Sequence, residues 1–261
     1  MRRGIRGEIR EIKEIITIND NQMKVDILAL GAHPDDVEMS CAGTLLAAMA
    51  VGKTVGIVDF TRGELGTRGT PATRAAEAAA SNKILGIAVR ENLGLPDGFF
   101  RNEREHQLPL IAAIRRYQPE VVLCNAIEDR HPDHGRAAQL ASDACFLAGL
   151  RMVETFGDDG LPQAAWRPRN VYHYIQDRQL PPAFVVDITP HWAKKWEAIQ
   201  AFKTQFFDLE SKEPQTYLSS QTFANFMEAR AREFGHIIGV EFGEGFTAAR
   251  PVGVREVGDL L

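Results

Sequence analysis

Residues 23–51 read MKVDILALGAHPDDVEMSCAGTLLAAMAV, and this stretch decides the fold. Residues 25–32 form a nearly continuous apolar run, which is typical of a strand buried on both faces of a parallel sheet. Residues 37–51 are rich in alanine and leucine and end before Gly52, so they are predicted to form a helix. The stretch therefore predicts one strand–loop–helix unit.

The same order of elements repeats downstream. Further strands are predicted at residues 54–60, 88–93 and 121–125, and further helices at residues 72–85, 105–117 and 135–150. Strands that alternate with helices indicate βαβ units, whose crossovers are right-handed almost without exception. The predicted fold is α/β, a three-layer Rossmann-like doubly wound and mostly parallel sheet. If its strand order is 3-2-1-4-5, strands one and four are neighbours on opposite sides of the point where the order reverses.

The alternation ends near Arg151. Strands at residues 171–175 and 184–188 and amphipathic helices at 191–207 and 219–234 are predicted to form a C-terminal extension. Because no internal repeat or low-complexity segment is visible, we expect this part to complete a single domain of residues 23–261. Residues 1–22 carry isoleucines at helical spacing, which suits a docking helix, a fraying helix or an N-terminal extension outside the domain.

The composition excludes several classes of protein. The chain has 261 residues, 44% of them hydrophobic and 25% charged, and a formal net charge of −5, so it has no overall positive field that would attract nucleic acid. The longest apolar stretches fall well short of the roughly 20 residues that span a bilayer, and no unbroken apolar segment stands at the N-terminus. We expect a cytoplasmic globular protein that binds neither nucleic acid nor membrane.

The three cysteines, Cys41, Cys124 and Cys145, lack the close pairing of zinc ribbons and redox motifs. Each has apolar or small neighbours, and we expect all three to be reduced and buried. Any metal site must therefore take its ligands from other residues.

Two segments at predicted strand–helix junctions contain His-Pro-Asp: HPDD at residues 33–36 and HPDH at residues 131–134. In an open α/β sheet, ligands bind outside the carboxyl ends of the strands where the strand order reverses, and the order 3-2-1-4-5 places both segments there. Imidazoles and carboxylates are ligands that divalent cations take from such loops. The sequence therefore predicts a shared metal site.

Each segment alone has a simpler explanation, because proline at the first helical position followed by aspartate is a common way to start a helix. Two such segments on either side of the switch point are much harder to explain by capping. Residues 31–43 contain no G-x-G-x-x-G, so a dinucleotide would find no glycine turn for its pyrophosphate.

The segments AHPDDVE (residues 32–38) and HPDH resemble the two-part motif of the LmbE-like, or PIG-L, family of zinc-dependent N-acetylglucosamine deacetylases. Three stretches further resemble the bacillithiol-biosynthesis branch of that family: TRGELGTRGT at 61–70, RENLGLPDG at 90–98 and DRHPDHGRAA at 129–138. The similarity runs from about Met23 to the C-terminus and is densest before Ala148.

The resemblance implies that zinc is bound by His33, Asp36 and His134, with water in the open position of a catalytic site. It implies that Asp35 is the general base, which takes a proton from the water and later returns it to the leaving amine. Zinc lowers the pKa of bound water to about 7, which makes this transfer feasible. The same two-histidine, one-carboxylate set also suits Fe(II).

The resemblance also implies roles for residues around the metal. His131 would stabilise the oxyanion or protonate the leaving group, and Asp133 would orient His131. Arg74 would meet the substrate or the developing oxyanion, or else be a solvated residue of a surface helix. Arg62 lies in a glycine-rich loop that either folds over a ligand or only connects two elements. Asp97 either accepts a sugar hydroxyl or forms a Pro-Asp-Gly turn.

Together with these residues, the resemblance implies a zinc-dependent amidohydrolase that removes acetate from an N-acetylglucosamine conjugate. The resemblance points to N-acetylglucosaminyl malate, an intermediate of bacillithiol biosynthesis, as the substrate. The alternatives are another substrate, such as a chitin oligosaccharide or a mycothiol-type or antibiotic precursor, and a sugar- or nucleotide-binding protein without turnover. Asp35 discriminates against the binding protein, because a pure binder gains nothing from a second acid beside the metal ligand.

The resemblance further implies a homo-oligomer, and hexamers occur in the family. Trp192, Trp196, Phe202 and Phe206 fall at helical spacing in the C-terminal part. We expect them to pack in the core or at a subunit interface before any role in stacking on a sugar.

Overall fold

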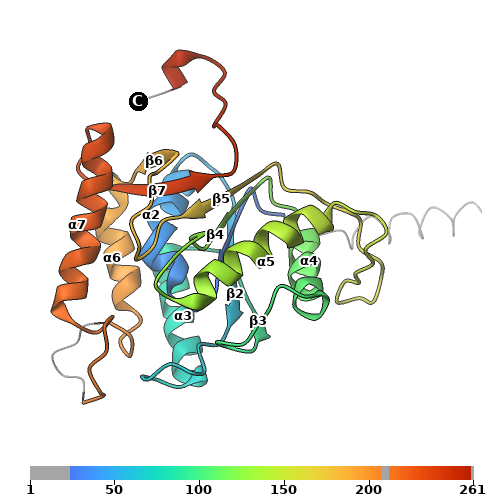
Figure 1. Cartoon of the computed structure of the whole chain (residues 1–261), viewed down its shortest axis with the longest axis horizontal. Coiled ribbons are helices and arrows are strands. Elements are labelled where there is room, and N and C mark those ends of the chain that lie inside the picture. Colours follow the sequence, from blue (N-terminus) through green and yellow to red (C-terminus); the bar gives the residue numbers. More distant parts are fainter. Residues whose placement is uncertain (1–23, 207–211, 260–261) are drawn as a thin grey trace, which may run out of the picture.

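Seven strands form one sheet at the centre of the structure, a computed structural model that describes residues 24–206 and 212–259 (Figure 1). The N-terminal extension predicted for residues 1–22 lies outside the described residues. The strands are β1 (Ile27–Gly31), β2 (Val55–Thr61), β3 (Val89–Leu95), β4 (Val121–Cys124), β5 (Asn170–Tyr174), β6 (Phe184–Asp187) and β7 (Gly243–Ala248).

The order of the strands is β3-β2-β1-β4-β5-β7-β6. Strands β1 to β5 pair in parallel, and β7 pairs antiparallel with both β5 and β6. The predicted α/β fold and the order 3-2-1-4-5 are therefore confirmed. The strand order reverses between β1 and β4, which are hydrogen-bonded neighbours.

Helices cover both faces of the sheet. They are α2 (Asp36–Ala50), α3 (Pro71–Leu85), α4 (Arg104–Tyr117), α5 (Pro132–Ala148), α6 (Trp192–Gln200) and α7 (Gln221–Ile238), with 3₁₀ turns at Thr189–His191 and Val257–Asp259. Helices α4 and α5 lie side by side on one face (Figure 1), and α2, α3 and α6 contact one another on the other face. None of the helices in the described ranges combines the length and apolar character needed to cross a membrane.

The alternation of side chains along β1 divides the core into two layers. Leu28 and Leu30 point into the cluster that contains the apolar residues of α4 and α5, whereas Ala29 lies in the cluster formed with α2. All three β1 side chains are fully buried, as expected for the central strand of a sheet covered on both faces. Burial on both faces of the sheet therefore explains the continuous apolar run at residues 25–32.

Strand β7 is absent from the sequence prediction. Its sequence, GEGFTA, contains two glycines and only one large apolar residue, Phe246, and so has little strand propensity. Its pairing with β5 and β6 supplies the stabilisation that the local sequence lacks. The fold is extended by an antiparallel pair that periodicity alone does not reveal.

The helix predicted at residues 191–207 is shorter than expected. Helix α6 ends at Gln200, and the backbone N–H of Thr204 donates to Glu77 of α3 at 2.7 Å instead of continuing the helical ladder. Residue 207 lies outside the described residues. The predicted apolar packing is confirmed: Phe202 and Phe206 are buried in one cluster with Phe223.

Two further predictions about packing are confirmed. The ring of Trp192 stacks on Phe242 and on Trp196, with ring centroids 4.6 and 5.8 Å apart. The three cysteines at positions 41, 124 and 145 are free and buried.

Candidate metal centre and active site

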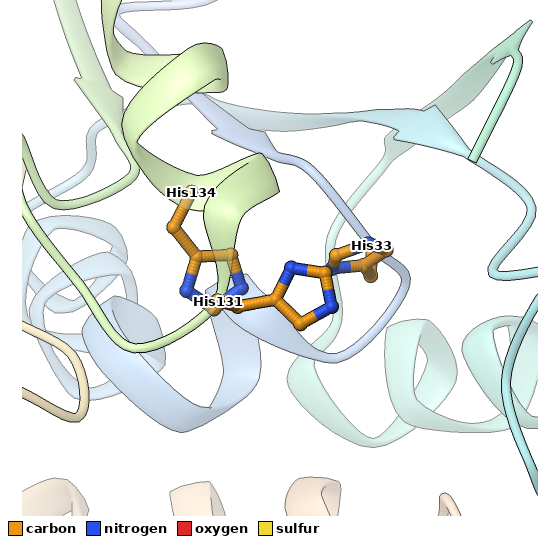
Figure 2. Close-up of side chains that lie close together, drawn as sticks. All are labelled: His33, His131 and His134. Carbon is orange, nitrogen blue, oxygen red and sulfur yellow. The ribbon is translucent and has the colours of Figure 1, made fainter. Parts of the chain in front are cut away.

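The loops that follow β1 and β4 bring three histidines together (Figure 2). His33 lies between β1 and α2, and His131 and His134 lie at the start of α5. The ring centroid of His33 is 4.7 Å from that of His131 and 5.6 Å from that of His134, and the last two are 5.1 Å apart. Because β1 and β4 are adjacent parallel strands, the two His-Pro-Asp segments meet at the switch point.

Asp36 joins His33 to His134. Its Oδ1 lies 3.1 Å from Nε2 of His134, and its Oδ2 lies 3.6 Å from Nδ1 of His33. Two side-chain amides hold the carboxylate from behind: Asn125 donates to Oδ2 at 3.0 Å and Gln176 to Oδ1 at 3.2 Å. Burial opposes ionisation of Asp36, but the charge of His134 and hydrogen bonds from both histidines hold its pKa well below the usual range.

Each of these two histidines also has a carboxylate on its other ring nitrogen. Nε2 of His33 lies 3.0 Å from Asp97 and 3.3 Å from Asp133, and Nδ1 of His134 lies 2.5 Å from Asp129. A carboxylate in this position holds the ring proton on the nitrogen that it contacts and leaves the other nitrogen available to a metal. The available nitrogens, Nδ1 of His33 and Nε2 of His134, are the two that face Asp36.

This donor set fits a zinc ion. The fit is one of donor chemistry, because zinc takes imidazole nitrogens and carboxylate oxygens. Asp36 reaches His134 through Oδ1 at 3.1 Å and His33 through Oδ2 at 3.6 Å. Burial lowers the pKa of His134, but Asp36 and Asp129 raise it more, to about 9. A bound cation would take the place of this proton. His33, Asp36 and His134 would hold the ion, and the set suits Fe(II) as well.

Asp35 lies next to this centre on a strained backbone. Its φ of 141° is one that residues other than glycine rarely adopt, at a cost of about 1–3 kcal/mol. Arg74 holds the segment in place, because its Nη2 lies 3.0 Å from the Asp35 carboxylate and donates to the carbonyl oxygen of Pro34 at 2.6 Å. Burial raises the pKa of Asp35 and the charge of Arg74 opposes it, which leaves the pKa at about 7. A pKa near neutrality suits a general base.

Arg74 is buried, with only 4% of its surface exposed. The alternative of a solvated surface arginine is therefore wrong. Besides its contacts with residues 34 and 35, Arg74 donates through Nη1 to Gln205 at 3.2 Å, and Gln205 follows α6 in the chain. A residue of the C-terminal part, Gln205, thus positions Arg74, and Arg74 in turn positions the carboxylate of Asp35.

His131 caps the N-terminus of α5. Its Nδ1 accepts a hydrogen bond from the backbone N–H of Asp133 at 3.2 Å, so the proton of the neutral ring is on Nε2. Burial, together with the positive charges of His33 and His134, lowers the pKa of His131 to about 4. His131 is therefore a neutral hydrogen-bond donor at physiological pH.

The carboxylate of Asp133 has partners other than the His131 ring. Its Oδ2 lies 3.3 Å from Nε2 of His33 and accepts from the backbone N–H of Gly98 at 2.8 Å, while its Oδ1 accepts from Arg136 at 2.6 Å. Asp133 reaches His131 through its backbone N–H. Its side chain orients His33.

The two remaining candidates occupy different environments. Asp97 is buried in the turn after β3, and its two oxygens contact His33 at 3.0 Å and the backbone N–H of Leu65 at 2.9 Å. Arg62 is exposed and lines a hollow between α3 and β3, together with Pro34 and Arg90. Contact with substrate stays a prediction for both residues.

The first part of the chain matches a protein-family model described as PIG-L, GlcNAc-PI de-N-acetylase, over residues 28–145. The uncharacterised deacetylase YaiS of Escherichia coli is 30% identical over 125 residues, which cover 46% of this chain and 67% of YaiS. The chain belongs to the PIG-L family. It is thus an enzyme of a family of metal-dependent N-deacetylases, which hydrolyse amide C–N bonds.

Two other relatives of this PIG-L chain carry different names. The 4-oxalmesaconate hydratase of Pseudomonas putida is 29% identical over 212 residues, which cover 72% of this chain and 76% of the hydratase. The 1D-myo-inositol 2-acetamido-2-deoxy-alpha-D-glucopyranoside deacetylase of Nakamurella multipartita is also 29% identical, over 201 residues, and the match covers 62% of this chain and 64% of that enzyme.

Solved structures show the same PIG-L fold. The conserved protein TT1542 from Thermus thermophilus superposes with a TM-score of 0.79 at 35% identity, covering 89% of this chain and 98% of that one. The N,N'-diacetylchitobiose deacetylase from Pyrococcus horikoshii has a TM-score of 0.72 at 23% identity and covers 96% of this chain and 94% of its own. The second likeness concerns the fold alone.

Three residues of this PIG-L site were missed by the sequence analysis: Asn125, Asp129 and Gln176. Asp129 stands in the loop before α5, five positions before His134, and an acidic residue so close to a predicted ligand was a usable signal. Asn125 directly follows β4, and Gln176 is the second residue after β5, so both stand at the carboxyl edge of the sheet where site residues gather.

Proposed function

We propose that this protein is a deacetylase that hydrolyses the acetamido group of an N-acetylglucosamine conjugate and releases acetate and a free amine. The observation that carries the proposal is the convergence of His33, Asp36 and His134, with the strained Asp35 beside them. The family membership and the inositol-glucosaminide deacetylase among the relatives support the same reaction.

A bound zinc ion would supply a Lewis acid for the amide carbonyl and lower the pKa of a water molecule. Asp35 takes the proton from the attacking water and returns it to the leaving nitrogen, for which its pKa of about 7 suits it. His131 donates from Nε2 to the oxyanion as it develops. Arg74 keeps the Asp35 carboxylate in position and limits the rise of its pKa.

We propose N-acetylglucosaminyl malate as the substrate to test first, because three stretches of the sequence resemble the bacillithiol branch. The experiment is metal analysis of the purified protein, followed by an assay of amine release from a panel of substrates. The panel contains N-acetylglucosaminyl malate, its inositol counterpart and diacetylchitobiose. If kcat/KM is highest for the malate conjugate, that conjugate is supported as the substrate. If kcat/KM is higher for another member of the panel, that member becomes the assigned substrate.

The enzyme proposal also has outcomes that would refute it. If the protein binds stoichiometric metal but releases no amine from any substrate of the panel, it is better explained as a sugar- or nucleotide-binding protein without turnover. The predicted homo-oligomer is checked separately by light scattering on the purified protein.

The match to the hydratase supports a second candidate reaction, the addition of water to a carbon–carbon double bond. The same residues could serve it, because a carboxylate that takes a proton from water is needed in both reactions. The two are separated by incubating the protein with 4-oxalmesaconate and following the loss of ultraviolet absorbance. Absorbance loss without amine release from the sugar panel would establish the hydratase.

A further inference from the structure

A cavity of about 50 Å³ lies behind the metal centre, between α2, α7, strand β7 and residues 175–177, which follow β5. His134 forms part of its wall, so the cavity is separated from the predicted metal position by one imidazole ring. Its other walls are largely apolar and include Met39, Phe223, Phe226 and Met227. No role in the proposed reaction accounts for it.

One polar group in the cavity wall has an unused hydrogen-bond donor. Arg230, on α7, donates through Nη2 to the backbone carbonyl of Asp177, and its guanidinium carbon lies 4.7 Å from the ring centroid of Phe226. Its Nη1 is buried and has no hydrogen-bond partner in the part of the chain that the structure describes. A buried donor on a charged group is costly to leave unpaired. An acceptor from outside the chain would remove this cost.

The acidic groups of the wall are already engaged. Glu244 forms an ion pair with Lys195 at 2.6 Å. The carboxylate of Asp129 contacts Nδ1 of His134 at 2.5 Å. The carboxylate of Asp177 accepts from the hydroxyl of Tyr217 at 2.8 Å. Burial lowers the pKa of Arg230, although the charges of Asp177, Asp129 and Glu233 act to raise it. Within the described residues, none of the wall carboxylates is hydrogen-bonded to Nη1 of Arg230.

The size and polarity of the cavity define the ligand. One buried water needs about 10–15 Å³, so a cavity of about 50 Å³ has room for a small ligand and not only for a single water. A carboxylate of four heavy atoms, with a methyl group against the apolar wall and an oxygen on Arg230, meets both requirements. A phosphate or dicarboxylate would bring charge that the apolar side chains cannot solvate.

We propose that this cavity binds a short-chain monocarboxylate through Nη1 of Arg230 and that it receives the acetate released at the metal centre. The second half of the proposal rests on the proposed deacetylase function, whereas the binding of a monocarboxylate does not. Arg230 would thus govern product release by offering the acid a charged partner away from the reacting atoms.

The test is a titration of the full-length, metal-free protein with ¹³C-labelled acetate, followed by NMR. A ligand of four heavy atoms is expected to bind with a roughly millimolar Kd. Arg230→Gln should weaken binding at least about tenfold, as expected for loss of a charge-assisted hydrogen bond. Arg232→Gln is the matched control, because Arg232 lies on the same helix but is exposed and pairs with Glu228 and Glu241. It should leave the Kd unchanged.

Two results would overturn the proposal: no saturable acetate binding by the wild-type protein up to about a hundred times the expected Kd, or equal binding by wild type and Arg230→Gln. Met227→Trp provides a second variant should the first fail to fold, since it fills the cavity from another wall and should also abolish binding. With the metal restored, acetate should inhibit wild-type turnover more strongly than Arg230→Gln turnover. Arg230-dependent binding without any turnover would reject the proposed function and leave the carboxylate site standing.

Discussion

Replacing Asp129 with asparagine should weaken zinc binding while preserving the fold. Oδ2 of Asp129 lies 2.5 Å from Nδ1 of His134, and its Oδ1 accepts from the backbone N–H of Arg178 at 2.8 Å. Asparagine can keep the second contact with its amide oxygen but presents an NH₂ group to the imidazole. Because this group cannot accept a hydrogen bond from Nδ1–H, the neutral ring loses the partner that keeps its proton on Nδ1 and leaves Nε2, the nitrogen that faces Asp36, available to the metal.

Loss of such a supporting contact typically costs a factor of 10–100 in metal affinity, which is about 1.4–2.7 kcal/mol. The side chain of Asp129 is only 1% exposed, so water cannot take over its role, and we expect the upper end of the range. The assay is competition for zinc with a chromophoric chelator at neutral pH. Asp143→Asn, on α5 and bonded to Asn102 and Gln139, is the control. A change of less than about threefold for Asp129→Asn would refute the orienting role.

Three further outcomes follow from the structure. Asp35→Asn should keep stoichiometric zinc but lower kcat at least about a hundredfold; an unchanged rate would mean that another group is the base. Because His134 has a pKa of about 9 without metal, zinc affinity should rise with pH towards that value. Calorimetry at pH 7.5 should detect protons released on binding, and heats independent of the buffer would contradict this. Lys195→Met leaves Glu244 buried without its ion-pair partner at 2.6 Å. The free energy of unfolding, measured by urea titration, should fall by about 3–5 kcal/mol. A loss below about 1 kcal/mol would show that the ion pair is dispensable for stability.

The central sheet could be predicted because its signals are local. The apolar run of β1 reports burial on both faces, and the handedness of βαβ crossovers then leaves few strand orders. The meeting of the two His-Pro-Asp segments followed from that order without any knowledge of side-chain positions. Strand β7 could not be found in this way, because its two glycines give no local preference and only its partners make it a strand.

The supporting residues of the site were harder to predict because their roles depend on distances across the fold. Gln176 is 140 positions from the Asp36 carboxylate that it contacts, and Gln205 is 131 positions from Arg74. No spacing in the sequence encodes such pairs. The burial of Arg74 has the same cause: its helix looks solvated until the segment after α6 is packed against it.

Zinc binding by His33, Asp36 and His134 is tested most directly by anomalous diffraction at the zinc absorption edge, measured on crystals of the zinc-loaded protein. We expect one strong peak, about 2.0–2.2 Å from Nδ1 of His33, from Nε2 of His134 and from a carboxylate oxygen of Asp36. A peak held by fewer than these three residues, or one located instead at the cluster of Glu103, Glu105 and His106, would contradict this ligand set.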